Sequence, residues 1–153
     1  MLRYDKKYLI KRSLLEIKIA TEEEIKYCYK IMSQTNENLS EEDFISLISQ
    51  QIKNGYKLIY VLENNEVICV TGFVIAQKIA WGKHLHIEDF VTSKSLKSTE
   101  AAKALFDFIK IYAKQQKCTS IHLDSSVDRE EAHKFYLYEN MKIDSYHFSI
   151  DLK

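Results

Sequence analysis

Three histidines lie where they could bind a metal ion together. His84 and His86 are two residues apart on one predicted strand, and side chains two apart share a face of a strand. His122 falls on a second strand, which we expect to lie close to the first. Histidines on strands more often satisfy ordinary hydrogen bonds than bind metals. We therefore predict that the protein holds no metal ion.

The cysteines and glycines exclude several common kinds of site. The cysteines are Cys28, Cys69 and Cys118. Their odd number and the lack of a CxxC pair argue against a zinc knuckle and a disulfide framework, and indicate reduced thiols in the cytoplasm. The glycines are Gly55, Gly72 and Gly82. No two of them stand in GxGxxG or GxxxxGK spacing, so we predict neither a dinucleotide-binding fold nor a P-loop.

The length and charge of the chain indicate one globular domain. The chain has 153 residues, of which 46% are hydrophobic and 29% charged. This is enough apolar sequence to form one hydrophobic core, so we predict a single domain over residues 1–153. Lys plus Arg and Asp plus Glu number 22 each, so no net field favours nucleic acid or an anionic membrane. We expect a cytoplasmic protein that binds neither nucleic acid nor membrane. The sequence leaves a homodimer open.

Hydrophobic periodicity predicts ten elements in the order β-α-α-β-β-β-α-β-α-β. In the strands apolar and polar residues alternate, whereas each helix carries an apolar stripe at helical spacing. In chain order the predicted elements are a strand at 14–18, helices that begin after Thr21 and Ser40, strands at 57–62, 67–76 and 84–91, a helix at 98–116, a strand at 120–123, a helix at 130–140 and a strand at 145–152.

Local signals fix several of these ends. Thr21 and Glu24 form a T-x-x-E capping box, and Gly55 stops the second helix. The polar turn at 63–66 makes the strands on either side of it an antiparallel hairpin. The helix at 98–116 connects two strands that we expect to be parallel neighbours. The fold class is therefore α/β (α+β), a mixed sheet covered by helices.

Three segments in this order resemble the GNAT superfamily of acyl-CoA N-acyltransferases. They are the strand HIEDFVT at 86–92, the strand IHLDS at 121–125 and the helix AHKFY at 132–136. The A-x-x-F-Y helix followed by a final strand is the most specific of the three. The resemblance covers nearly the whole chain. It implies a GNAT-like fold and the transfer of an acetyl group from acetyl-CoA to an amine.

The resemblance implies a catalytic role for Glu88. A primary amine with a pKa of about 10.4 costs about 4–5 kcal/mol to deprotonate at pH 7, so a base is useful. Glu88 stands two residues before Phe90, where many family members carry a carboxylate that acts directly or through water. Alternation puts Asp89 on the opposite face, unless a bulge resets the register. The alternative for Glu88 is a strand carboxylate paired with a surface lysine.

Tyr136 is the second residue of the Phe-Tyr pair and matches the family tyrosine that protonates the coenzyme A thiolate. A phenol with a pKa of about 10 lies about 1.5 units above a thiol with a pKa of about 8.5. The proton transfer is therefore mildly uphill and needs help from a local hydrogen bond. The alternative for Tyr136 is a packed tyrosine whose hydroxyl reaches water.

The pyrophosphate-binding loop of the family is degenerate in this sequence. The family pattern is a basic residue or Gln, two free positions, Gly, one free position, then Gly or Ala, leading into a helix whose N–H groups hold the phosphates. Lys97 and Ala102 fit, but Glu100 replaces the central glycine, and its charge costs about 1–3 kcal/mol beside a phosphate about 5 Å away. An acidic residue also suits the first turn of a helix. The residues that the resemblance assigns to acetyl-CoA are Phe90, Val91, Thr92, Lys97, Ser98, Thr99, Glu100, Ala101, Ala102 and Lys103.

Together these features favour an N-acetyltransferase that uses acetyl-CoA as co-substrate and a primary amine of a small molecule or peptide as acceptor. The run Glu88-Asp89-Phe90 also resembles family members that acetylate polyamines, which implies a cationic acceptor. The alternative is a catalytically weakened protein of the same fold that binds a ligand or a protein partner. Glu100 favours that alternative, whereas Glu88 and Tyr136 favour the enzyme.

Overall fold

The computed structural model of the chain describes residues 15–96 and 98–153. Leu14, expected in the first strand, and Lys97, assigned to acetyl-CoA, lie outside the described residues. The chain divides between His122 and Leu123 into two compact units, and each is described by itself. The prediction of one domain over residues 1–153 stays a prediction. No helix within the described ranges is long and apolar enough to cross a membrane.

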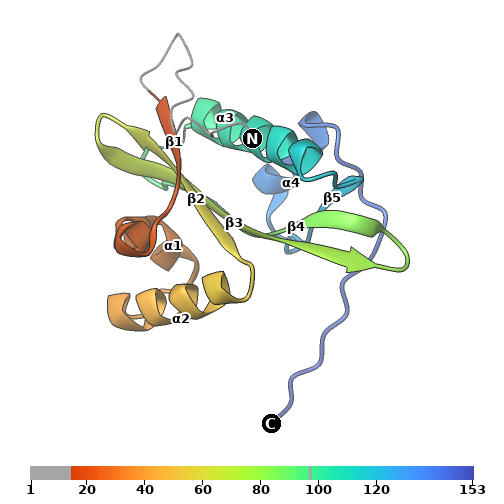
Figure 1. Cartoon of the computed structure of the whole chain (residues 1–153), viewed down its shortest axis with the longest axis horizontal. Helices are drawn as coiled ribbons and strands as arrows, with labels where there is room; N and C mark the ends of the chain where they lie inside the picture. The colour runs from red at the N-terminus through yellow and green to blue at the C-terminus, as the bar shows by residue number, and fades with distance from the viewer. Residues whose placement is uncertain (1–14, 97) are drawn as a thin grey trace. The chain divides into compact units, whose positions relative to one another are not determined.

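A five-stranded sheet forms the frame of the first unit, and its strands follow one another across the sheet in sequence order (Figure 1). The strands are β1 (Leu15–Ile19), β2 (Lys57–Glu63), β3 (Glu66–Lys78), β4 (Gly82–Thr92) and β5 (Ser120–Leu123). The pairs β1–β2, β2–β3 and β3–β4 are antiparallel. β5 is the neighbour of β4, as expected for two strands joined by a crossover helix.

The first predicted helix is present but is wound more tightly than expected. The segment consists of the 3₁₀ helix η1 (Glu22–Cys28), the α-helical turn α1 (Tyr29–Met32) and the 3₁₀ helix η2 (Ser33–Thr35). At its start, the Thr21 backbone N–H donates to Glu24 Oε2 at 2.9 Å, as the capping box predicts. The capping signal therefore fixes where the helix begins and not which type of helix follows.

The predicted ends of the second helix and of the hairpin are confirmed. In α2 (Glu41–Lys53), the Ser40 Oγ accepts a hydrogen bond from the Asp43 N–H at 3.1 Å. Gly55 follows the helix with a φ of +97°, a conformation that favours glycine. Asn64 and Asn65 both have positive φ, which is the backbone of a two-residue hairpin turn between β2 and β3.

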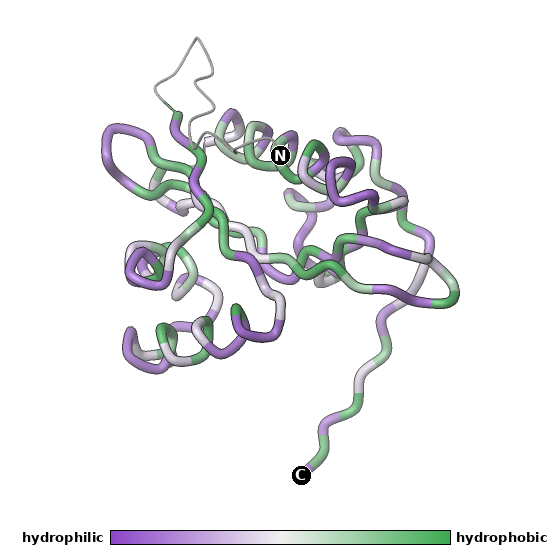
Figure 2. Tube along the Cα trace, viewed as in Figure 1, coloured by the Kyte–Doolittle hydropathy of each residue, from purple (hydrophilic) through white to green (hydrophobic). Residues whose placement is uncertain are grey.

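Helices cover both faces of the sheet in the first unit (Figure 1). On one face lies α3 (Thr99–Gln115), where the Phe73 and Tyr112 rings are 5.2 Å apart and the Phe90 and Phe106 rings 6.3 Å apart. On the other face, the buried side chains of η1, α1 and α2 pack with those of the central strands, including Val91. Figure 2 shows the corresponding apolar stretches along the central strands and the polar turns between them.

β4 contains a bulge at Glu88. Gly72 of β3 is paired with Asp89, and the next residue, Phe73, is paired with Ile87. Glu88 is therefore an extra residue in β4 without a partner in β3. Cross-strand partners point to the same face of a sheet, so Asp89 shares the face of Gly72 and Ile87 shares the face of Phe73.

The bulge overturns the simple alternation of side chains that the sequence predicted for β4. Strict alternation put Asp89 on the face of Ile87, opposite His86 and Phe90. The extra residue moves Asp89 to the side of His86, and it moves Phe90 to the α3 side with Ile87. The reason is geometric, since one added residue exchanges the two faces for every residue that follows.

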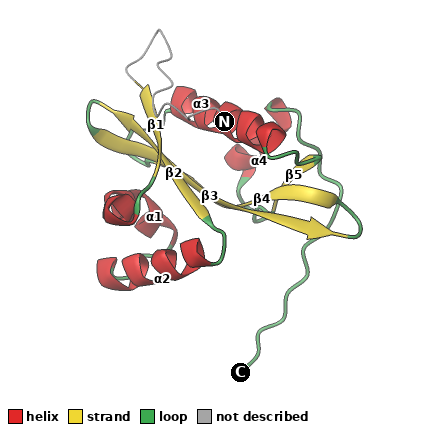
Figure 3. Ribbon diagram, in the orientation of Figure 1, coloured by secondary structure: helices red, strands yellow, loops and turns green. Residues whose placement is uncertain are grey.

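The second unit contains α4 (Glu130–Tyr138) but no closing strand in its described residues. The strand predicted at 145–152 is wrong: residues 141–153 form neither helix nor strand (Figure 3). The alternating apolar residues of this segment are 83–91% exposed: Tyr146, Phe148, Ile150 and Leu152. Alternation gives a strand its two faces, but its backbone N–H and C=O groups also need a neighbouring strand. The other nine predicted elements are confirmed.

Candidate active site

The C-terminal half of β4 carries the predicted base, Glu88, and three of the residues that the sequence assigned to acetyl-CoA, Phe90, Val91 and Thr92. Glu88 is exposed in the bulge. Phe90 and Thr92 are half-buried, and Val91 is buried among the apolar side chains of the α1 and α2 side. The exposed carboxylate therefore lies at the one place in β4 where pairing with β3 is interrupted.

Asp89 has a partner that sequence reasoning missed. The hydroxyl of Tyr56, the residue before β2, donates to Asp89 Oδ2 at 2.6 Å, and Thr71 Oγ1 donates to the Asp89 carbonyl at 2.7 Å. Burial raises the pKa of the Asp89 carboxyl, while the hydrogen bond from Tyr56 acts in the opposite direction. The pKa of Tyr56 is raised by burial and by the neighbouring Asp89 charge, so Tyr56 remains a protonated donor. The signal that could have revealed this contact is Gly72, a glycine inside a strand.

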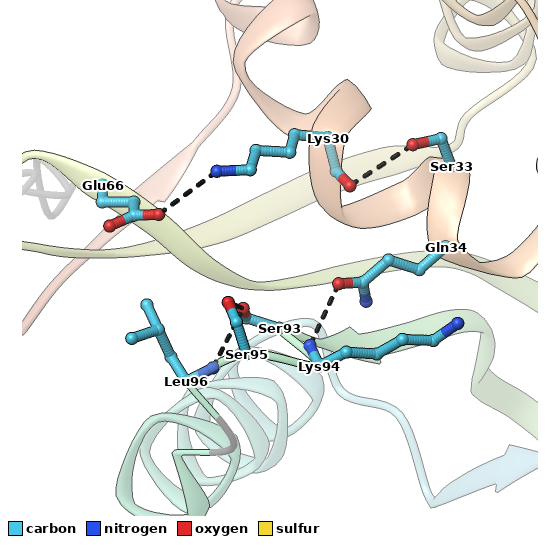
Figure 4. A network of polar contacts seen from close by, with 8 residues as sticks. All are labelled: Lys30, Ser33, Gln34, Glu66, Ser93, Lys94, Ser95 and Leu96. Atoms are coloured by element: carbon cyan, nitrogen blue, oxygen red, sulfur yellow. Dashed lines mark hydrogen bonds and ion pairs between the residues drawn. The ribbon is translucent and has the colours of Figure 1, made fainter.

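The loop that leads from β4 towards α3 is held by side chains from two places (Figure 4). From η2, the Gln34 Nε2 donates to the Thr92 carbonyl at 2.8 Å, and the Gln34 Oε1 accepts from the Lys94 N–H at 3.0 Å. Within the loop, the buried Ser93 accepts a hydrogen bond from the Leu96 N–H at 3.3 Å. Nothing in the sequence singles out Gln34, because its partners are backbone groups about 60 residues away.

Ser98 caps the start of α3. The Ser98 Oγ accepts from the Ala101 N–H at 3.1 Å, which uses one of the N–H groups that the first turn of a helix leaves unpaired. Thr99 and Glu100 are exposed, whereas Ala101 and Ala102 are buried against the sheet. The Glu100 side chain is therefore on the solvent side of the helix start.

Lys103, one of the residues assigned to acetyl-CoA, forms an ion pair within α3. Its Nζ lies 3.3 Å from the nearer carboxylate oxygen of Asp107, one helical turn further along α3. Asp107 also pairs with Lys110 at 2.7 Å, and the two lysines lower the pKa of its carboxyl. Part of the positive charge of Lys103 is thus already balanced within the helix.

Tyr136 belongs to the second unit, so its position is described within that unit. It is buried on α4, and its ring centroid lies 5.6 Å from that of Phe135. Its carbonyl accepts from the Met141 N–H at 3.0 Å, where the chain leaves the helix. The A-x-x-F-Y motif therefore lies on a helix, as expected, with its tyrosine packed inward.

Two of the three histidines, His84 and His122, form ordinary ring contacts and hydrogen bonds. The His84 and His122 rings both pack on Trp81, with His122 stacked at 3.7 Å and His84 edge-on at 5.1 Å. His84 Nδ1 lies 2.9 Å from the Gly82 carbonyl, and His122 Nε2 lies 2.9 Å from the Ser120 Oγ. In the described part of the chain, no group of three or more His, Cys, Asp or Glu side chains is placed to hold a metal ion.

All three cysteines are free thiols. Cys28 and Cys69 are buried, and burial raises the pKa of each to about 12. Burial also raises the pKa of Cys118, which is only half-buried. None of the three has the lowered pKa of a nucleophilic cysteine.

Fold and sequence together define the class of the protein. Residues 23–138 match the acetyltransferase (GNAT) family, and the chain belongs to that family. It is therefore an acetyltransferase, and the co-substrate of the family is acetyl-CoA. An uncharacterised N-acetyltransferase of Bacillus subtilis is 29% identical over 132 residues, which are 85% of this chain and 93% of the relative.

Solved structures of acetyltransferases share the fold. An aminoglycoside N-acetyltransferase in complex with CoA matches with a TM-score of 0.81 at 10% identity, over 95% of this chain and 99% of the other. A glucosamine-6-phosphate N-acetyltransferase from Arabidopsis thaliana matches with a TM-score of 0.74 at 20% identity, over 91% and 99%. A ribosomal-protein-alanine N-acetyltransferase from Brucella melitensis matches with a TM-score of 0.79 at 11% identity, over 91% and 99%. These likenesses confirm the GNAT-like fold predicted from the sequence.

Proposed function

We propose that the protein transfers the acetyl group of acetyl-CoA to a primary amine of a cationic small molecule or peptide. The observation that carries the proposal is the exposed Glu88 carboxylate in the bulge of β4. An exposed carboxylate attracts an ammonium group and accepts a proton from it. The acceptors named for the similar solved structures, an aminoglycoside, an amino sugar phosphate and a protein alanine, belong to those proteins.

In this proposal Glu88 takes the proton that the acceptor amine must lose before it attacks the thioester. The amine then forms the new C–N bond, and the sulfur of coenzyme A leaves with the electron pair of the C–S bond. Tyr136 donates its phenolic proton to that thiolate. The second proton, which the nitrogen loses as the amide forms, passes to water, and Tyr136 is reprotonated from water. Glu88 thus acts on the acceptor and Tyr136 on the leaving group.

Acetyl-CoA is assigned to the end of β4 and the first turn of α3. Phe90, Val91 and Thr92 would line the pantetheine and acetyl part, and the first-turn N–H groups of Thr99 and Glu100 would face the pyrophosphate. The small buried Ala101 and Ala102 support this assignment, since they keep the helix start close to the sheet. The remaining residues of the assigned set are Lys97, Ser98 and Lys103.

The direct test of the function is an acetyl-transfer assay that measures release of the coenzyme A thiol. With acetyl-CoA, we expect faster transfer to spermidine than to glucosamine or to a peptide with a free N-terminus, because Glu88 favours a highly cationic acceptor. Transfer to none of these amines, with acetyl-CoA binding intact, would contradict the proposal. It would favour a binding protein of the same fold.

Replacement of Glu88 tests its role as the base. Glu88→Gln should lower the rate at pH 7 by about 10²- to 10⁴-fold, and much of this loss should disappear near pH 10, where more free amine exists. Rates are measured from pH 7 to 10 beside Glu37→Gln, an exposed glutamate in a turn. A constant deficit across this range would mean that Glu88 only attracts the cation, and no deficit would remove it from the site.

Tyr136→Phe tests the proton donor. We expect this variant to bind acetyl-CoA nearly as well as the original protein, but to turn over about 10²- to 10⁴-fold more slowly. Binding is measured by calorimetry and turnover by thiol release. The matched control is Tyr138→Phe, an exposed tyrosine on the same helix. If acetyl-CoA binding and turnover fall by the same factor, the role of Tyr136 is in packing and not in proton donation.

Glu100 should weaken acetyl-CoA binding to the micromolar range or beyond. Glu100→Gly should lower the Kd for acetyl-CoA by about 5- to 150-fold, because it removes a charge of the same sign as the phosphates. The matched control is Glu42→Gly, which stands at the same position after the Ser40 cap of α2. Calorimetry that shows an unchanged or higher Kd for Glu100→Gly would refute the repulsion.

A further inference from the structure

We propose that Asp89 is a second carboxylate for the acceptor ammonium group, and that Tyr56 is the positioning residue that orients it. The inference rests on the proposed transfer to a cationic amine. It assigns the ionic contact with that amine to Asp89 Oδ1, next in the chain to Glu88. The acceptor is therefore a cation that meets two carboxylates, one exposed in the bulge and one held by a hydrogen bond.

The hydrogen bond from Tyr56 to Asp89 spans the strand that lies between them. Tyr56 lies before β2, Gly72 lies in the neighbouring β3, and Asp89 is the residue of β4 paired with Gly72. A Cβ atom at position 72 would overlap the hydroxyl and ring of Tyr56. The phenol therefore crosses β3 over the glycine, and reaches Asp89 Oδ2 at 2.6 Å.

The two oxygens of the Asp89 carboxylate have different surroundings. Oδ2 accepts the hydrogen bond from Tyr56, and the Asp89 carbonyl is held by Thr71. In the described residues no donor reaches Oδ1, and Oδ1 is not among the buried side-chain atoms that lack a partner. An unpartnered oxygen with no exposed surface would be among those atoms, so Oδ1 retains some exposure to solvent. A fixed carboxylate with one oxygen exposed is suited to bind an ammonium group.

Few other titratable groups surround this pair. The charges that act on Tyr56 besides Asp89 are those of Glu88 and the buried Cys28 thiol, and His84 and His86 share the face of Asp89 on β4. In the described residues, no lysine or arginine forms an ion pair with Asp89. The negative charge of the Asp89 carboxylate is therefore supported by the hydrogen bond from Tyr56 and is not cancelled by a lysine or arginine among these residues. A bound ammonium group would supply the missing positive charge.

Loss of the Tyr56 hydroxyl should raise the pKa of Asp89, because the hydrogen bond favours the charged carboxylate. Tyr56→Phe keeps the buried ring and removes this bond. We expect an upward shift of about one to two pH units, the size of one hydrogen bond to a charged group. Gly72→Ala should shift the pKa in the same direction, because it displaces the phenol. The matched control is Tyr29→Phe, which removes the hydrogen bond from Tyr29 to the Leu39 carbonyl and should leave Asp89 unchanged.

The experiment follows the ¹³C resonance of the Asp89 carboxyl against pH in the protein without acetyl-CoA, with and without spermidine. Asp89→Asn identifies the resonance. Spermidine should lower the pKa of Asp89 in the original protein, since a bound cation favours the carboxylate. In the transfer assay, Asp89→Asn should raise the KM for spermidine by about 10- to 100-fold and leave the Kd for acetyl-CoA unchanged. The activity of Tyr56→Phe should fall at a higher pH than that of the original protein as the solution is acidified.

Two results would overturn the inference. One is a pKa of Asp89 that does not change in Tyr56→Phe. The other is spermidine that is acetylated without any effect on the Asp89 resonance. If Tyr56→Phe does not fold, the spermidine titration of the original protein and the KM of Asp89→Asn decide alone. A protein in which spermidine shifts Asp89 but no amine is acetylated would refute the proposed function and leave the binding role of Asp89 standing.

Discussion

The candidate site depends on the interruption of β-pairing at one residue of β4. Both faces of this sheet are covered by helices, so each buried residue of β4 must fit one of two cores. The extra residue at Glu88 turns Phe90 towards α3 and Val91 towards α1 and α2. The same step releases Glu88 from pairing and brings Asp89 opposite Gly72. The packing of both cores and the positions of the two carboxylates thus depend on the same change of register.

Features determined by neighbouring residues were predictable from the sequence, and features determined by distant ones were not. The Ser40 and Ser98 caps and the Asn64-Asn65 turn involve residues at most three positions apart. Tyr56 meets Asp89 across 33 positions, and nothing distinguishes Tyr56 among 10 tyrosines except the path over Gly72. Residues 145–152 show the opposite case. Their alternation is typical of a strand, but pairing depends on a partner that alternation cannot reveal.

The residues at the start of α3 stabilise the helix, whereas a bound phosphate would need the same backbone N–H groups. The Ser98 hydroxyl and the acidic Glu100 both stabilise the first turn, one by a hydrogen bond and the other through the helix dipole. A phosphate draws on the same N–H groups and the same dipole. In this chain Glu100, which stabilises the helix, stands at the position of the central glycine in the family pattern. The exposed position of Glu100 leaves its charge in high-dielectric surroundings, where its effect is smallest.

The buried cysteines have a consequence for an enzyme that handles a thioester. A thiol attacks a thioester as the thiolate, and at pH 7 a thiol with a pKa of about 12 is ionised in about one molecule in 10⁵. Cys28 and Cys69 both have such a pKa. These sulfurs therefore do not compete with the amine for the acetyl group, and they do not form mixed disulfides with the coenzyme A that is released. The apolar core thus protects these two thiols from acylation by the substrate of the protein.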